Sequence, residues 1–270
     1  MRTPMMAGNW KMNCDNEEAW DLAIGVADAT EAVEGCTVVL CPPFTALSTV
    51  EEAIEGTDLA LGAQNLYWAE KGAFTGEISP QMLTSCGCEY VIVGHSERRG
   101  RFGAAPEADA GLLTVFGDSD ATVSRKTCAA LASDLMPIVC VGELLSERQA
   151  GQTDQIVEAQ VRAALEGLDP EDIEDVTFAY EPVWAIGTGE VCDAPEANRV
   201  LGMIRSVLGE IVGAEAAAEM ILLYGGSMKP DNVRGLMEQP EVDGGLVGGA
   251  SLQAEHFAEM VRIAAEVKGG

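Results

Sequence analysis

The sequence predicts an α/β protein that folds as a single (β/α)8 barrel. Two observations predict this fold: short apolar runs recur along the chain without polar alternation, and a helical pattern follows each of them. Continuous apolar strands are typical of a parallel sheet that is buried on both faces. Barrels of this kind commonly contain about 250 residues. The length of 270 residues therefore predicts one domain over residues 1–270.

The expected strands follow one another at intervals that leave room for a helix. They span residues 5–10, 37–41, 59–63, 90–93, 137–141, 176–180, 220–224 and 245–247. Because strand and helix alternate throughout, we expect the sheet to close into a barrel. An open doubly wound sheet is the structural alternative. It usually has a GxGxxG turn after its first strand, and this sequence has none there.

Apolar residues at helical spacing predict the helices between these strands. The clearest helices are expected over residues 19–33, 157–168, 195–211 and 257–267. Gly35 supplies a stop for the first of them, and Pro195 is a favourable first residue for the third. The stretch 101–124, which is rich in Gly, Ala and Asp, follows the fourth strand and is irregular.

Composition excludes several classes of partner. Acidic residues number 44 against 16 basic ones, and the formal net charge of −28 argues against binding to nucleic acid. The chain has no apolar run of the roughly 18 residues that a membrane span needs, so no membrane partner is expected. The N-terminal residues lack an apolar signal region, which predicts a cytoplasmic protein.

The cysteines and histidines do not form a metal-binding pattern. The eight cysteines include no CxxC pair, and His95 and His256 lie far apart in the sequence. A structural zinc site is therefore not expected, and most thiols are interpreted as small core residues. The chain is also too long and too rich in core residues to need disulfides. We place His256 in the last helix, without a catalytic role.

Polar and glycine-rich motifs follow five of the expected strands. Asn9 and Lys11 end the first strand, and GHSERR begins directly after the fourth. EPVWAIGTG follows the sixth strand, while GGS and GG follow the seventh and eighth. In a parallel barrel the carboxyl ends of all strands meet at one face, where active sites are found. We therefore expect these motifs to form one site.

The motifs together resemble one family. AGNWKMN, GAQN, GAFTGEIS, GHSERR, PIVCVGE, YEPVWAIGTG, YGGS and LVGGASL follow one another along nearly the whole chain. In kind and order they resemble the triosephosphate isomerase family. The resemblance implies a homodimeric (β/α)8 enzyme of glycolysis and gluconeogenesis, without metal or cofactor. Its substrates would be dihydroxyacetone phosphate and glyceraldehyde 3-phosphate, interconverted through an enediolate.

Proton transfer between adjacent carbons of a phosphorylated triose requires a base and donors for the developing oxyanion. Glu181 is the candidate base. His95, Lys11 and Asn9 are the candidate donors, and a neutral His95 is the better-matched one. A helix that begins directly after His95 would favour this neutral imidazole. The family resemblance implies that Glu97 supports this end of the site.

The substrate phosphate needs donors of its own. Backbone N–H groups at Gly187, Ser227, Gly248 and Gly249 are the candidates, since backbone donors at such turns bind phosphate. Residues 182–189 contain Pro, Trp and two glycines, which predicts a hinged lid over the bound substrate.

The resemblance also implies a dimer loop, and the chain departs from the family in two places. Residues 65–79 are expected to reach into a second copy of the chain, with Thr75 near the neighbour's site. Residues 104–115 have the character of an insertion, and Glu190 stands where the family typically has a lysine at the end of the lid. Neither departure removes a candidate catalytic residue.

Two other functions are compatible with parts of this pattern. Another phosphate-binding barrel, such as a lyase or a synthase, would explain Ser227 and Gly248-Gly249. It does not explain the joint presence of Lys11, His95 and Glu181. A catalytically silent barrel that serves as a scaffold would be expected to lack at least one of those three residues, and all three are present.

Overall fold

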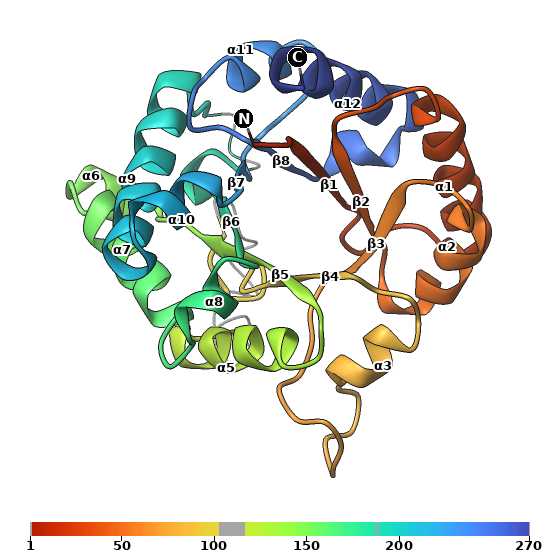
Figure 1. Ribbon diagram of the computed structural model, residues 1–270, viewed down its shortest axis with the longest axis horizontal. Helices are drawn as coiled ribbons and strands as arrows, with labels where there is room; N and C mark the ends of the chain where they lie inside the picture. The colour runs from red at the N-terminus through yellow and green to blue at the C-terminus, as the bar shows by residue number, and fades with distance from the viewer. Residues whose placement is uncertain (1, 103–116, 187, 189, 270) are drawn as a thin grey trace.

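In the computed structural model of the chain, residues 2–102, 117–186, 188 and 190–269 are described. Eight parallel strands form a closed barrel in chain order (Figure 1). They are β1 (Met5–Asn9), β2 (Thr37–Cys41), β3 (Leu59–Ala63), β4 (Tyr90–Val93), β5 (Met136–Val141), β6 (Thr177–Tyr180), β7 (Leu222–Tyr224) and β8 (Gly244–Val247). The predicted (β/α)8 barrel is confirmed, and the strands differ from their expected bounds only at the ends.

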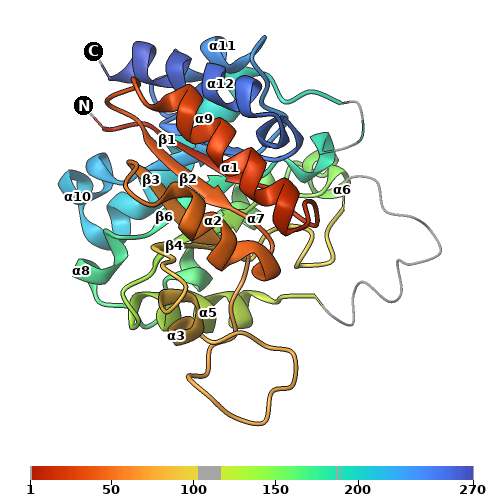
Figure 2. The same cartoon turned by 90° about the vertical axis from the view of Figure 1, so that its right-hand side faces the viewer.

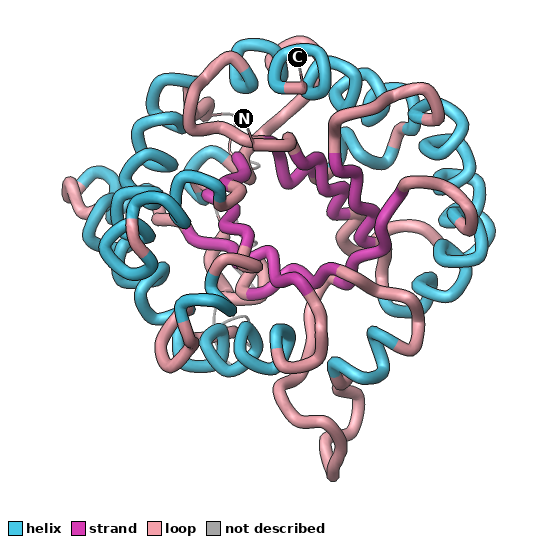
Figure 3. The backbone as a smooth tube through the Cα atoms, in the orientation of Figure 1, coloured by secondary structure: helices cyan, strands magenta, loops and turns pink. Residues whose placement is uncertain are grey.

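Helices surround the strands on the outside (Figure 3). The longer ones are α1 (Asn16–Thr30), α2 (Leu47–Ile54), α5 (Asp120–Leu131), α7 (Thr153–Ala164), α9 (Ala194–Val212) and α12 (Ala254–Lys268). The shorter ones are η1 (Phe44–Ala46), α3 (Pro80–Thr84), α6 (Leu145–Gln149), α8 (Pro170–Ile173), η3 (Val183–Ala185), α10 (Ala214–Glu219), α11 (Val233–Met237) and η4 (Gly249–Leu252). Parallel strands require such crossovers, which place a helix between successive strands.

Local capping explains where several helices begin and end. Asp15 accepts hydrogen bonds from the first turn of α1, and the Glu18 side chain accepts one from the Asp15 N–H, so the two residues form a capping box. The expected extension of this helix to residue 33 is wrong, because the Val33 N–H bonds to Thr30 O in a turn. The α7 helix likewise ends before the expected residue 168.

Two apolar layers stabilise the barrel. Alternate strand residues, among them Ala7, Val39, Ile92 and Cys140, form one buried cluster. Their neighbours in the same strands belong to the larger cluster that packs against the helices. Because successive strand residues point to opposite faces, the smaller cluster fills the barrel interior. The interior is therefore packed, and a ligand can enter only at the ends of the strands.

Ion pairs stabilise the N-terminal end of the barrel. The Asp243 side chain, which is 2% exposed, accepts hydrogen bonds from Arg2 Nε and Arg205 Nη2, both at 2.7 Å. It also accepts the Leu222 N–H at 3.0 Å. This carboxylate thus ties the entry of β1 and helix α9 to the beginnings of β7 and β8.

A long loop between β3 and α3, residues 65–79, projects away from the barrel (Figures 1 and 2). Tyr67 stacks on Trp68 with ring centroids 4.1 Å apart and contacts Phe74 at 4.5 Å. These contacts give the loop a small aromatic cluster of its own. The expected insertion at residues 104–115 lies outside the described residues. No helix among the described residues is long and apolar enough to cross a membrane.

Candidate functional site

A cavity of about 590 Å³ lies at the carboxyl ends of the strands. It is lined by Asn9, Lys11, His95, Ile186, Gly225, Gly226, Ser227, Met228, Lys229, Pro230, Asp231, Leu246, Gly248, Gly249, Ala250, Gln253 and His256. Six of the candidate site residues are among them: Asn9, Lys11, His95, Ser227, Gly248 and Gly249. Four strands therefore contribute candidate residues to one cavity, as their positions at the strand ends predict.

The remaining candidates lie elsewhere. Glu181 is 1% exposed and lies behind His95 rather than on the cavity wall. Glu97 contacts Lys11 at the side of the cavity. Thr75 is exposed on the projecting loop, away from the cavity of its own chain. Gly187 lies outside the described residues.

The Glu181 carboxylate is held by three hydrogen bonds. Oε1 accepts from His95 Nε2 at 3.0 Å and from Ser96 Oγ at 3.0 Å. Oε2 accepts the Ser96 N–H at 2.9 Å. Burial alone would raise the pKa of this carboxyl, but the interactions with His95 and Ser96 outweigh it and the pKa of Glu181 is lowered. Glu181 is thus ionised in this position and a weak base.

The hydrogen bonds of His95 identify its tautomer. Its Nδ1 accepts the backbone N–H of Glu97 at 3.2 Å, so we assign the proton of the neutral ring to Nε2, which faces Glu181. The expected helix directly after His95 is wrong. The chain instead forms a tight turn, in which the N–H groups of Arg98 and Arg99 bond to His95 O. This turn supplies the Glu97 N–H that Nδ1 accepts.

Lys11 is held in an uncommon backbone conformation. Its φ of 54° lies in the left-handed region, which non-glycine residues adopt only when their surroundings enforce it. Asn9 Oδ1 accepts the Lys11 N–H at 3.0 Å, and Gln64 Nε2 donates to Lys11 O at 2.8 Å. The Lys11 ammonium pairs with Glu97 Oε1 at 2.6 Å. It also lies beside Gly248, where an added Cβ would be 3.9 Å from Nζ.

Backbone donors gather opposite these groups, where β8 ends. The first hydrogen bond of η4 runs from the Ser251 N–H to Gly248 O at 2.8 Å, and Ser251 Oγ donates to the same oxygen at 2.7 Å. Gly249 and Ala250 precede this bond in η4 and line the cavity. Across the cavity, Asn232 Nδ2 donates to Ser227 O at 2.9 Å and fixes that turn.

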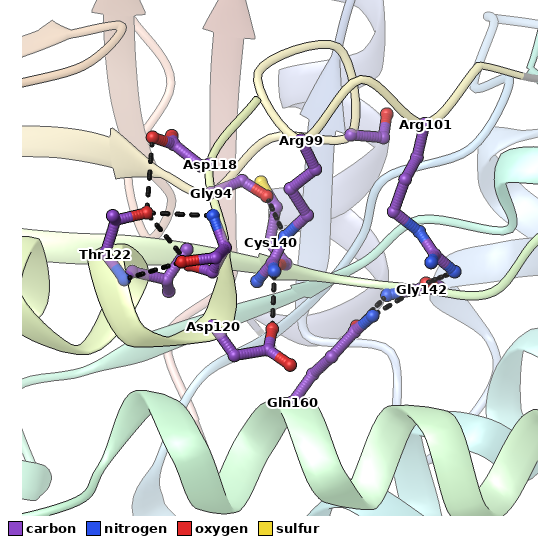
Figure 4. Close-up of polar contacts among 12 residues, drawn as sticks. Gly94, Arg99, Arg101, Asp118, Asp120, Thr122, Cys140, Gly142 and Gln160 are labelled. Carbon is purple, nitrogen blue, oxygen red and sulfur yellow. Dashed lines mark hydrogen bonds and ion pairs between the residues drawn. The ribbon is translucent and has the colours of Figure 1, made fainter. Parts of the chain in front are cut away.

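An arginine behind the site fixes the loop that carries His95 (Figure 4). Arg99 donates to Gly94 O at 2.7 Å, to Cys140 O at 3.3 Å and to Asp120 Oδ1 at 2.6 Å. It therefore joins the ends of β4 and β5 to the first turn of α5. Gly94 has φ of +68°, which glycine adopts without strain.

Gly142 makes room for the backbone of Glu181. A Cβ added to Gly142 would lie 1.8 Å from Glu181 O. Gln160 accepts the Gly142 N–H at 2.7 Å and donates to Gly142 O at 3.2 Å, as Figure 4 shows. The close approach of β5 and β6 beside Glu181 therefore requires glycine at this position.

A buried carboxylate underlies the beginning of the lid segment. Glu143 Oε1 accepts hydrogen bonds from Trp184 Nε1 at 2.9 Å, from Tyr180 OH at 3.2 Å and from Thr153 Oγ1 at 3.2 Å. Burial raises the pKa of Glu143. Arg148 covers the Trp184 ring at 4.2 Å. These contacts anchor η3 to the ends of β5 and β6.

Sequence reasoning assigned no role to several of these residues. Ser96 and Arg99 belong to GHSERR, Gln64 to GAQN, and Glu143 to PIVCVGE. The motifs that predicted the site therefore already contained these residues. Their roles depend on contacts between distant segments, which the sequence does not display.

Among the described residues, no group of three or more His, Cys, Asp and Glu side chains is arranged to hold a metal ion. The donors at the cavity are instead ammonium, imidazole, amide and backbone N–H groups. Such donors suit an anionic, oxygen-rich ligand.

Comparisons with known proteins agree with this geometry. Residues 4–264 match the model of the family described as "Triosephosphate isomerase". The triosephosphate isomerase of Roseiflexus castenholzii is 50% identical over 263 residues, which cover 97% of this chain and 98% of that protein. The triosephosphate isomerase of Moorella thermoacetica is 49% identical over 267 residues, with 97% and 98% covered. That of Rhodopirellula baltica is 47% identical over 263 residues, with the same coverage.

Proposed function

The chain belongs to the triosephosphate isomerase family, and from this premise we propose how its own residues interconvert dihydroxyacetone phosphate and glyceraldehyde 3-phosphate. The observation that carries the proposal is the contact of Glu181 with His95, which lines a cavity that also presents Lys11. A base, a neutral donor and a cation are the groups that enediolate chemistry on a phosphate ester requires.

Glu181 acts as the base in this proposal. Its carboxylate takes a proton from one carbon of the substrate, which leaves an enediolate, and returns a proton to the neighbouring carbon. Because Glu181 lies behind the cavity wall, it must first turn away from Ser96 towards the substrate. The donors that lower its pKa are then lost. Its basicity rises at the point where proton abstraction needs it.

The same movement prepares His95. Its Nε2–H donates to Glu181 in the free protein, and it becomes available to a substrate oxygen when the carboxylate leaves. A neutral imidazole then stabilises the enediolate oxygen without giving up a full proton. The Glu97 N–H holds the tautomer that this step needs. One rearrangement thus activates both the base and the electrophile.

Lys11 and the backbone donors bind the phosphate in this proposal. We call Ser227, Gly248 and Gly249 the phosphate cradle, and we assign Gly187 to it as well. The Lys11 ammonium lies beside Gly248 and supplies a positive charge between the cradle and the reacting carbons. Asn9 holds the strained Lys11 backbone through its side-chain oxygen. Closure of the lid at residues 182–189 would exclude water from the enediolate.

We further propose that the protein is a homodimer. The projecting loop at residues 65–79 exposes Phe74 to 42%, and Met12 and Met82 are exposed to 96% and 51%. Exposed apolar side chains of this size are typical of a protein interface. The loop would enter a second copy and bring Thr75 near that copy's site. We also propose a role in glycolysis and gluconeogenesis in the cytoplasm, and this proposal rests only on membership of the family.

A coupled assay tests the proposed function. The purified protein should convert glyceraldehyde 3-phosphate to dihydroxyacetone phosphate, which a dehydrogenase that oxidises NADH then consumes. Inorganic phosphate should inhibit competitively, since it occupies the cradle. A folded preparation that shows neither conversion nor competition would overturn the proposal.

A further inference from the structure

The cavity does not end at the phosphate cradle. The segment that contains Ser227 continues along the wall as Lys229, Pro230 and Asp231. The segment that contains Gly249 continues as Gln253 and His256, at the beginning of α12. We call these five residues, 229–231, 253 and 256, the outer compartment. It opens directly onto the cradle because the same two segments line both.

The cavity is large for the proposed substrate. Cavities of about 300–1,000 Å³ hold drug-sized ligands, and a triose phosphate is considerably smaller than these. The volume of about 590 Å³ therefore leaves space after the phosphate and the three carbons are bound. The outer compartment is the part that this substrate does not need.

The outer compartment contains one lysine and one carboxylate, so it lacks the excess of negative charge of the protein as a whole. The chain carries a formal net charge of −28, yet the cavity wall presents Lys11 and Lys229 against a single carboxylate, Asp231. Of the lysines in the described ranges, Lys11 and Lys126 form ion pairs, and Lys229 is not among those paired. A cation that lacks a carboxylate partner in so acidic a protein is available to an anion.

The backbone on either side of Lys229 is fixed. The Lys229 N–H donates to Asn232 Oδ1 at 2.8 Å, while Asn232 Nδ2 donates to Ser227 O at 2.9 Å. One asparagine therefore sets both the cradle turn at Ser227 and the origin of the Lys229 side chain. Gln253, directly before α12, and His256, in its first turn, line the same cavity. A small set of donors thus faces the same space.

We propose that Lys229, Gln253 and His256 form a second anion subsite, which binds the outer phosphate of a diphosphate whose inner phosphate occupies the cradle. Diphosphates, whether inorganic or esterified, would then be competitive inhibitors. The proposal rests on the proposed function, because the cradle must bind the inner phosphate. A diphosphate suits the arrangement because its second anionic group is attached to the first and can extend outward, away from His95.

The test compares inorganic pyrophosphate with inorganic phosphate as inhibitors of isomerisation, without divalent cations and at constant ionic strength. Pyrophosphate should inhibit competitively and bind about tenfold more tightly than phosphate, the scale expected for added charge-assisted hydrogen bonds. Lys229→Gln should weaken pyrophosphate about tenfold. It should leave the inhibition constant for phosphate and the KM nearly unchanged. His256→Gln should act in the same direction.

Two further variants separate local from general electrostatics. Asp231→Asn removes the one carboxylate of the compartment and should tighten pyrophosphate binding. Arg262→Gln removes one positive charge from an exposed position of α12 outside the cavity. It should leave pyrophosphate binding unchanged.

The outcomes distinguish the two levels of the proposal. If phosphate itself does not compete with substrate, the cradle and with it the proposed function are wrong. If phosphate competes but pyrophosphate binds no more tightly, or if Lys229→Gln and Arg262→Gln have equal effects, the outer subsite is wrong and the proposed function stands.

Discussion

Nε2 of His95 lies 3.0 Å from Oε1 of Glu181. The two residues come from the ends of β4 and β6, and they are in contact before any substrate is bound. The proposed base and the proposed electrophile are therefore hydrogen-bonded to each other in the free protein. In the proposed mechanism, substrate binding separates the two side chains.

Replacement of Glu181 by Gln should lower kcat about 10²–10⁴-fold, since a positioned general base contributes about that much. An amide cannot take the proton, while the phosphate cradle remains intact. Turnover in the coupled assay and binding of inorganic phosphate by calorimetry are the measurements. Glu31→Gln, an exposed change far from the cavity, is the matched control. Turnover near that of the wild type would remove Glu181 from its proposed role.

Replacement of Ser96 by Ala should shift the pH dependence of kcat/KM. The Ser96 hydroxyl is one of the donors that lower the pKa of Glu181, so its removal raises that pKa. The fraction of ionised base then falls at a given acidic pH, and the acidic limb of the profile moves to higher pH. Ser96→Thr retains the hydroxyl and should keep the limb in place. An unmoved limb in the alanine variant would contradict this account of Glu181.

The same donors link Glu181 to stability. Because the pKa of the folded state is lowered, this carboxylate stabilises the protein above its unfolded pKa. That stabilisation is lost as the pH falls through the folded value. The Ser96→Ala protein should therefore lose less stability on acidification than the wild type. Melting temperatures measured from neutral to acidic pH provide the comparison.

Replacement of Asp243 by Asn should lower the free energy of unfolding by about 3–5 kcal/mol, as expected when one partner of a buried ion pair is removed. Arg2 and Arg205 then each lose an ion pair with Asp243, while Arg205 keeps the one with Glu241 at 2.6 Å. Urea denaturation measures the change. Glu210→Gln weakens an exposed pair with Arg162, and it should have little effect. Equal destabilisation in the two variants would refute the special role of Asp243.

Replacement of Thr75 by Asp should weaken both association and activity. The loop at residues 65–79 would have to bury a new charge in the interface, which is unfavourable without a partner. Thr75→Ser serves as the control because it keeps the hydroxyl. Sedimentation and turnover at matched concentrations are the measurements. A fully active monomer would exclude the proposed contribution of this loop.

Sodium chloride should raise the melting temperature. A net charge of −28 destabilises the folded state by self-repulsion, and salt shortens the Debye length from about 10 Å at 0.1 M to about 3 Å at 1 M. Activity should also tolerate salt better than that of a near-neutral relative, because weaker attraction at the cavity is offset by weaker repulsion from the surface. A melting temperature that is flat or falls up to about 1 M salt would reject this interpretation.

Much of the fold was predictable because buried parallel strands are continuous apolar runs. The helix ends were less so: the apolar stripe extends to Val33, but a turn at Thr30 ends α1. At the site, motif position was sufficient to bring Asn9, Lys11 and His95 to one cavity. It could not show that Glu181 lies outside that cavity, because its position depends on bonds to a residue 85 positions away.

The turn after His95 is a second feature that the sequence did not predict. Sequence favoured a helix there, whose dipole would keep the imidazole neutral. The structure has a tight turn whose single N–H acts on Nδ1 instead. The proposed donor role of His95 therefore depends on this turn and not on a helix, since local propensity does not specify how a turn is oriented on its neighbours.

The ion pairs of Asp243 and the contact of Glu181 with His95 lie at opposite ends of the strands. Residues this far apart, without shared partners, contribute almost additively to the properties of a protein. In a lineage that moves to a hotter or saltier habitat, substitutions near Arg2 and Arg205 can therefore accumulate without a cost in turnover. Substitutions that strengthen the Asp243 end should therefore raise heat tolerance without a change in catalytic rate.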